Sequence, residues 1–190
     1  MTESINVILL GDQCVGKSTL LKEWITPGLS GGVEKTIGID LATSMVKYKT
    51  TLFRIRFYDT AGRDCYDKLL VRYIFDADCC IVVFDVTDTE SWKKVEFWFK
   101  TIFETNGAMC SVVLIGNKID RESSRVVSKQ TVRTFIRNSR LKNVIYSECS
   151  AKTTENVLDT YHLLINFAKK PHREVFTTHD FKQPSKCIIF

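Results

Sequence analysis

Short runs of apolar residues recur along the chain at the length of single β-strands. They lie at residues 5–10, 51–58, 79–84, 112–115 and 144–146. Several of the runs are almost continuously apolar, which is typical of strands buried on both faces of a parallel sheet. The pattern therefore predicts a sheet that is covered on both sides.

Segments with helical spacing of apolar residues separate these runs. They lie at residues 17–24, 89–104, 128–138 and 154–169. In the last segment Val157, Tyr161 and Leu164 recur at the spacing of one helix face. Because strands alternate with helices over the whole length, the chain is predicted to form a doubly wound α/β domain.

Two stretches interrupt the alternation. Residues 26–38 contain Pro27 and several glycines and predict a long exposed loop, whereas residues 60–72 are polar and charged without clear periodicity. From residue 170 the chain is polar until a final CIIF. We therefore expect a folded domain over residues 1–169 and a flexible tail over residues 170–190.

The composition is that of an ordinary globular protein of 190 residues with a net charge of +5. This charge is compatible with binding to a nucleotide or to an anionic membrane, and equally with a role in solubility alone, so it does not discriminate among these functions. The 7 cysteines form no CxxC pair, so we expect reduced thiols in a cytosolic protein rather than disulfides or a zinc site. The N-terminus does not resemble a signal peptide, and no apolar run is long enough to span a membrane.

Residues 11–18, GDQCVGKS, match the phosphate-binding pattern G-x-x-x-x-G-K-[ST] between an apolar strand and a helical segment. In such a P-loop, backbone N–H groups converge on phosphate oxygens at a helix N-terminus. Lys17 would contact the β- and γ-phosphates, and the Ser18 hydroxyl would bind Mg²⁺. The alternative is a glycine-rich turn with an exposed lysine. The predicted nucleotide-binding residues here are Gln13, Cys14, Val15, Gly16, Lys17, Ser18 and Thr19.

Asp59 follows an apolar strand directly. A carboxylate at the C-terminal end of a strand in an open α/β sheet lies near the expected ligand site, so Asp59 is a candidate Mg²⁺ ligand. Taken alone it could equally be a helix cap or a turn residue.

Two further motifs follow buried strands, namely NKID at residues 117–120 and CSAK at residues 149–152. The Asp120 carboxylate can accept two hydrogen bonds from the N1–H and N2–H₂ edge of guanine, a donor pair that adenine lacks. Either motif alone would usually be a surface turn. In this order behind the P-loop, they resemble the guanine-recognition elements of the Ras superfamily.

The resemblance implies roles for the residues of both motifs. Asn117 would brace the base and the P-loop, Lys118 would lie along the base, and the Ala151 N–H would contact guanine O6. The base-binding residues that it implies are Asn117, Lys118, Asp120, Ser150, Ala151 and Lys152.

Within the superfamily the chain is most similar to Rab proteins, through TIGID at 36–40, YDTAG at 58–62 and FDVTD at 84–88. The similarity extends over roughly residues 4–169. It implies a small G domain of the P-loop NTPase class, with a mostly parallel six-stranded sheet and helices on both faces. Thr36 in switch I would close over Mg²⁺ and the γ-phosphate, and the Gly62 amide in switch II would reach the γ-phosphate. The implied metal ligands are Ser18, Thr36 and Asp59, and the implied catalytic residues are Lys17, Thr36, Gly62 and Arg63.

Three positions depart from the Rab pattern. Arg63 stands where a glutamine normally orients the attacking water, and a guanidinium has no carbonyl oxygen with which to do so. Gln13 would crowd the γ-phosphate. Leu29 replaces an aromatic residue that commonly covers the base, and Trp24 could compensate only if the loop were rearranged. We therefore expect slow GTP hydrolysis. We also expect that no aromatic residue at position 29 covers the guanine base.

The last four residues fit the C-a-a-X motif, and Phe at the last position indicates geranylgeranylation of Cys187. The alternative is an accidental apolar C-terminus. A single lipid chain gives marginal anchoring, and the basic residues of the tail would reinforce it only weakly. A prenyltransferase or escort protein is an implied partner, and the implied location is cytoplasmic, on the cytosolic face of a membrane.

Taken together, the motifs and the resemblance predict a switch that binds GTP or GDP with Mg²⁺ and regulates vesicle trafficking. Its expected partners are an exchange factor, a GTPase-activating protein and effectors that contact switch I and switch II, with no nucleic acid. A pseudo-GTPase scaffold and another Ras-type signalling GTPase remain open as alternatives. A kinase or ATPase with a P-loop is disfavoured because it would lack the two base motifs.

Overall fold

The computed structural model describes residues 2–28, 36–48, 51–62, 68–168 and 188–189. The strands are β1 (Thr2–Gly11), β2 (Ile39–Tyr48), β3 (Thr51–Thr60), β4 (Cys79–Asp85), β5 (Ser111–Asn117), β6 (Val144–Glu148) and β7 (Ile188–Ile189). The helices are α1 (Lys17–Ile25), α2 (Lys68–Phe75), α3 (Thr89–Asn106), α4 (Lys129–Asn138) and α5 (Val157–Ala168), with a 3₁₀ helix at Ile119–Ser124. None of the described helices is both long and apolar enough to cross a bilayer.

One sheet organises the domain, with the strand order β6-β5-β4-β1-β3-β2-β7. Four strand pairs are parallel, namely β1–β3, β1–β4, β4–β5 and β5–β6. Strand β2 pairs antiparallel with β3. The predicted mostly parallel six-stranded sheet is thereby confirmed. In addition, the two-residue β7 pairs with β2 opposite Val46 and Lys47.

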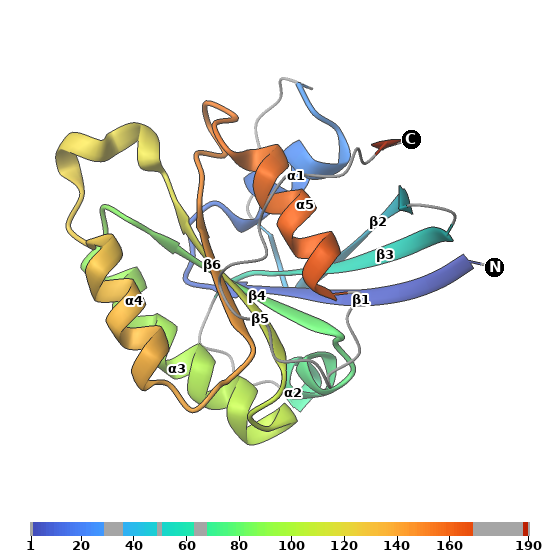
Figure 1. Cartoon of the computed structure of the whole chain (residues 1–190), viewed down its shortest axis with the longest axis horizontal. Helices are drawn as coiled ribbons and strands as arrows, with labels where there is room; N and C mark the ends of the chain where they lie inside the picture. Colours follow the sequence, from blue (N-terminus) through green and yellow to red (C-terminus); the bar gives the residue numbers. More distant parts are fainter. Residues whose placement is uncertain (1, 29–35, 49–50, 63–67, 169–187, 190) are drawn as a thin grey trace.

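Helices cover the sheet on both faces, as Figure 1 shows. Side chains of α1 and α5 form one core against the sheet, including Trp24 and Tyr161. Helices α2, α3 and α4 supply a second core on the opposite face, including Ile74, Trp98 and Val132. Strands β4 and β5 lie between the two cores and are buried along their whole length, which accounts for the apolar runs at their centres.

Strand β2 and helix α2 were not predicted from apolar spacing, and neither were the short β7 and the 3₁₀ helix. In β2 the inward position 44 is a buried serine, Ser44, while Leu41 is exposed, so the alternation of a half-buried strand is lost. In α2 the apolar residues lie on both faces: Ile74 is buried, but Leu69 and Phe75 are exposed. The helix begins at Lys68, so only the end of the stretch 60–72 belongs to it and the stretch as a whole shows no helical period.

Helix α5 begins later than the predicted residue 154. Thr154 and Asn156 both have a positive φ, of 63° and 57°, which α-helical backbone does not allow. The helix therefore starts at Val157. It ends at Ala168, and of the predicted tail only Ile188–Ile189 belongs to the described residues.

The C-terminal ends of the parallel strands meet at one edge of the sheet. Gly11 at the end of β1 pairs with Val83, and Asp85 at the end of β4 pairs with Asn117 at the end of β5. Ligands of open α/β sheets bind at this edge. The loops that follow these strands carry the predicted site residues.

Candidate nucleotide-binding site

Two glycines allow the P-loop to pass close to its neighbours. Gly11 has a φ of 137°, and a Cβ there would lie 2.2 Å from the carbonyl oxygen of Val83. Gly16 has a φ of 98°, and a Cβ there would lie 2.3 Å from Nδ2 of Asn117. Since only glycine tolerates both the conformation and the close approach, the motif's glycines fix the course of the loop between β1 and α1.

Lys17 is the first residue of α1 and turns back over the loop. Its Nζ donates hydrogen bonds to the carbonyl oxygens of Gly11, at 3.0 Å, and Asp12, at 2.7 Å. Burial lowers the pKa of Lys17 to about 8, although the charges of Asp59 and Asp12 partly oppose the shift. The ammonium group is thus held inside the loop, where a bound phosphate would meet it.

The three predicted metal ligands come together from three separate segments. Ser18 Oγ lies 2.8 Å from Thr36 Oγ1 and donates a hydrogen bond to Asp59 Oδ2, and Thr36 Oγ1 lies 3.3 Å from the same carboxylate oxygen. Two hydroxyls and a carboxylate are a ligand set that suits Mg²⁺.

The Asp59 carboxylate has unused capacity to bind a cation. The residue is 4% exposed, and its Oδ1 has no hydrogen-bond partner among the described residues. Burial raises the pKa of Asp59, while hydrogen bonds from Ser18 and Thr36 and the charge of Lys17 act against the rise. A buried carboxylate oxygen without a partner is costly unless a ligand satisfies it, so these residues fit a divalent cation.

The segment YDTAG at residues 58–62, the predicted start of switch II, lies directly against the P-loop. Gly62 has a φ of 71°, and a Cβ there would lie 2.5 Å from Nζ of Lys17 and 2.7 Å from the carbonyl oxygen of Asp12. The neighbouring Ala61 N–H donates to the Gly38 carbonyl at 3.0 Å. This hydrogen bond joins the segment before Gly62 to the segment that follows Thr36.

Asn117 connects the P-loop to the base motifs. Its Nδ2 donates to the carbonyl oxygen of Val15 at 2.8 Å, and its Oδ1 accepts from the Ala151 N–H at 3.0 Å. Ser150 Oγ donates to Asp120 Oδ1 at 2.6 Å and accepts from the Thr153 N–H. The bracing role expected for Asn117 toward the P-loop therefore has a geometric basis, and Ser150 orients the exposed Asp120 carboxylate.

Asp85 supports Lys118, a role that we did not predict from the sequence. Lys118 adopts a left-handed conformation with a φ of 69°, and its Nζ lies 2.7 Å from Asp85 Oδ2. Burial alone would raise the pKa of Asp85, but the contact with Lys118 and the hydrogen bonds from Thr87 lower it overall. Asp85 belongs to the FDVTD segment, but its contact with Lys118 follows from the register that places it opposite Asn117, which the sequence alone does not specify.

The remaining predicted residues occupy different positions. In the P-loop Gln13 and Cys14 are exposed, Val15 is buried, and Thr19 is partly buried in the first turn of α1; Lys152 is exposed beyond Ala151. The Gln13 N–H donates to Asp12 Oδ1 at 2.7 Å. Leu29, Arg63 and Cys187 lie outside the described residues.

Trp24 belongs to the core and does not replace the missing aromatic at position 29. It is 1% exposed, its Nε1 donates to the Val157 carbonyl at 3.0 Å, and its ring stacks on Tyr161. These contacts hold the indole between α1 and α5, where it cannot cover a base.

Comparison with known proteins identifies relatives over nearly the whole chain. A sequence model of the Ras family matches residues 6–170. The Ras-related protein RABG3e of Arabidopsis thaliana is 34% identical over 176 residues, covering 90% of this chain and 84% of the relative. The Ypt/Rab-type GTPase ypt71 of Schizosaccharomyces pombe is 30% identical over 95% of this chain and 89% of its own, and the Ras-related protein Rab7 of Cenchrus ciliaris is 32% identical over 90% and 86%.

Proposed function

Because the chain belongs to the Ras family, we propose that it is a Rab-type switch that binds GTP and GDP with Mg²⁺ and regulates vesicle trafficking. The observation that carries the proposal is the pair of hydrogen bonds made by the Asn117 amide. They tie the P-loop at Val15 to the second base motif at Ala151. A phosphate site and a guanine site are thereby held at a fixed separation, as one nucleotide requires.

Ser18, Thr36 and Asp59 would hold the magnesium ion. When bound, Mg²⁺ neutralises charge on the β- and γ-phosphate oxygens. The unpartnered Oδ1 of Asp59 supports this assignment because a cation would satisfy it. Chelation by EDTA should consequently speed nucleotide release.

Thr36 and Gly62 would make the switch sensitive to the γ-phosphate. Gly62 approaches Lys17 from one side, and the Ala61–Gly38 hydrogen bond couples the segment before Gly62 to the one after Thr36. A γ-phosphate between these groups would order both segments, and its loss on hydrolysis would release them.

Guanine selectivity would rest on Asp120, whose carboxylate Ser150 holds at 2.6 Å. Asp120→Asn replaces an acceptor pair with one acceptor and one donor, which fits xanthine because xanthine carries a carbonyl where guanine has its amino group. We expect the substitution to weaken GDP binding by about 100-fold or more and to create xanthosine diphosphate binding. Asp159→Asn, on α5, is the matched control and should leave GDP binding unchanged. Equal affinity of the unmodified protein for ADP and GDP would refute the proposal.

Hydrolysis is proposed to be slow. Arg63 follows Gly62 and cannot orient water as a glutamine amide does, so the GTP-bound state should persist until an activating protein supplies the missing group. Gln13 is exposed at the mouth of the P-loop, which supports its predicted interference with groups that approach the γ-phosphate.

A pseudo-GTPase scaffold is the second candidate, favoured by the unusual residues Gln13, Leu29 and Arg63. The assembled Ser18, Thr36 and Asp59 cluster argues against a scaffold that binds no nucleotide. A static nucleotide-bound scaffold differs from a switch in one measurable way: GDP and GTP would leave its switch segments in the same state. Another Ras-type signalling GTPase would share the site and differ only in its partners.

Partners are proposed to bind at the two switch segments, and the lipid at Cys187 would bring the protein to a cytosolic membrane surface. Large apolar side chains are exposed at Ile37 and Leu41 on one segment and at Leu69 and Phe75 on α2. Exposed apolar groups of this kind are typical of protein interfaces. They support binding of an exchange factor, an activating protein and effectors there.

A further inference from the structure

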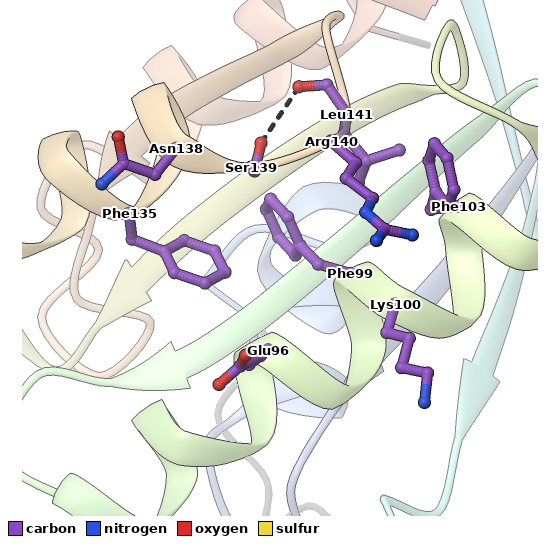
Figure 2. Close-up of a pocket in the computed structure, with 9 residues that line it drawn as sticks. All are labelled: Glu96, Phe99, Lys100, Phe103, Phe135, Asn138, Ser139, Arg140 and Leu141. Atoms are coloured by element: carbon purple, nitrogen blue, oxygen red, sulfur yellow. Dashed lines mark hydrogen bonds between the residues drawn. The ribbon is translucent and has the colours of Figure 1, made fainter.

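A cavity of about 440 Å³ lies between α3 and α4, in a part of the domain that the nucleotide site does not use. Figure 2 shows it bounded by side chains from α3 on one side and from α4 and the following turn on the other. Its volume is within the range of pockets that bind small organic ligands.

The apolar lining of the cavity is mainly aromatic. Phe99 and Phe135 meet edge to face with their ring centroids 4.9 Å apart, and Phe103 and Leu141 complete the lining. Phe99 and Leu141 are buried, so the apolar surface is anchored in the core of the domain. Three aromatic rings around one space favour a planar ring over a flexible chain, because they offer both edges and faces for contact.

Positive charge lies on one side of the cavity. The guanidinium carbon of Arg140 lies 5.3 Å from the centroid of the Phe103 ring, and no carboxylate among the described residues forms an ion pair with Arg140. Lys100 also lines the cavity, but in Figure 2 its ammonium points away from Arg140, and Glu96 lies on the other side. The contact with Phe103 orients the planar guanidinium, which can hold a carboxylate by two parallel hydrogen bonds.

We propose that this cavity binds a small aromatic carboxylate, with its ring against Phe99, Phe103 and Phe135 and its carboxylate on Arg140. Lys100 is largely exposed and lies 3.8 Å from Glu104, so the proposed contact with the carboxylate rests on Arg140. The site is independent of the P-loop and the base motifs, so a bound nucleotide would not compete for it.

The test uses 2-naphthoate as the probe and its neutral analogue 2-naphthamide as the matched ligand. Both are titrated into the full-length protein at saturating GDP while backbone amide NMR shifts are followed. Naphthoate should shift resonances of α3 and α4 and bind about tenfold more tightly than naphthamide, which corresponds to one charge-assisted contact. Arg140→Gln should reduce naphthoate binding to the naphthamide level.

Two variants serve as controls. Arg137→Gln removes an exposed arginine from the last turn of α4 and should change neither affinity. Phe135→Leu keeps an apolar side chain but removes one ring, and should weaken both ligands. No binding at millimolar naphthoate, equal affinity for the two ligands, or naphthoate binding that survives Arg140→Gln would each overturn the proposal.

Discussion

Lys94 on α3 forms an ion pair with Asp12 in the P-loop, with Nζ 3.0 Å from Oδ1. The Asp12 side chain is 13% exposed, and the same carboxylate oxygen accepts the Gln13 N–H. The Asp12 carbonyl oxygen in turn accepts a hydrogen bond from Lys17. Lys94 therefore helps to fix Asp12, whose carbonyl oxygen accepts the hydrogen bond from Lys17, the predicted phosphate-binding residue.

We expect Lys94→Met to speed release of a fluorescent GDP analogue by about twofold to fivefold, the effect of a partly exposed ion pair. Stopped-flow fluorescence measures the rate. Lys93→Met is the matched control, because Lys93 precedes Lys94 on α3 and pairs outward with Glu90 at 2.7 Å. Lys94→Arg should restore the unmodified rate, and equal release rates for the two methionine variants would contradict the role assigned to Lys94.

Cys14 offers a direct report on the phosphate site. It is the only exposed cysteine among the described residues, since Cys79, Cys80, Cys110 and Cys149 are buried. A nucleotide in the P-loop would cover it, so GDP well above its Kd should slow alkylation of Cys14 by N-ethylmaleimide about tenfold or more. Peptide mass spectrometry separates Cys14 from Cys65 and Cys187. Adenosine diphosphate should give no protection, and protection by neither nucleotide would show that the loop does not hold phosphate.

Apolar patterns predicted the parts of the fold that lie between its two cores. Strands β4 and β5 are buried along their whole length, and apart from the polar residues at their ends, Asp85, Ser111 and Asn117, their sequences are almost continuously apolar. Strand β2 lies outside that region, and its buried Ser44 accepts a hydrogen bond from Tyr161. That contact is a tertiary one that no local period can indicate, which is why β2 escaped prediction.

Sequence motifs predicted those candidate site residues that lie close together in one continuous segment of the chain. The P-loop is one continuous segment, so its lysine and serine could be assigned from spacing alone. The supports of that site come from other elements: Asp85 reaches Lys118 across neighbouring strands, and Lys94 reaches Asp12 from α3. Their pairing depends on the register of β4 and β5 and on the packing of α3, which the sequence does not specify locally.

Glu148 should make the stability of the protein depend on pH. Arg125 contacts both of its carboxylate oxygens, at 3.0 and 2.9 Å, and the Tyr146 hydroxyl donates to it. Burial alone would raise the pKa of Glu148, but these contacts lower it overall. A carboxyl group with a lowered pKa stabilises the fold above the ordinary glutamate value of about 4.3 and loses this effect as the pH falls through its folded pKa.

We therefore expect Glu148→Gln to reduce the free energy of unfolding by about 1 kcal/mol at pH 7, and the difference from the unmodified protein to shrink below about pH 4. Urea unfolding at a series of pH values measures it. Glu122→Gln is the control, because the Glu122 side chain is 66% exposed and should contribute much less. A difference that stays constant down to pH 3 would mean that the charge of Glu148 is not what stabilises the fold.

Hydrolysis tests the interpretation of position 63. Ras-type proteins that retain the glutamine turn over at about 10⁻⁴ s⁻¹ without an activating partner, and we expect a slower rate here. Arg63→Gln should raise single-turnover phosphate release several-fold, whereas Arg63→Lys, which keeps the charge but adds no amide, should not. Gln13→Gly should mainly restore sensitivity to an activating protein. Unmodified turnover as fast as that of Arg63→Gln would show that another residue orients the water.

The most direct test of a nucleotide-dependent switch is amide hydrogen exchange in its two switch segments, compared between protein loaded with GDP and protein loaded with a non-hydrolysable GTP analogue. The Ala61–Gly38 hydrogen bond couples the two segments, and Gly62 lies close to Lys17, the predicted contact of the γ-phosphate. Peptides that contain Thr36 and Gly62 should exchange more slowly with the GTP analogue, while peptides from β5 should not change. Identical exchange of the Thr36 and Gly62 peptides in the two nucleotide states would contradict the switch and leave a static nucleotide-binding scaffold.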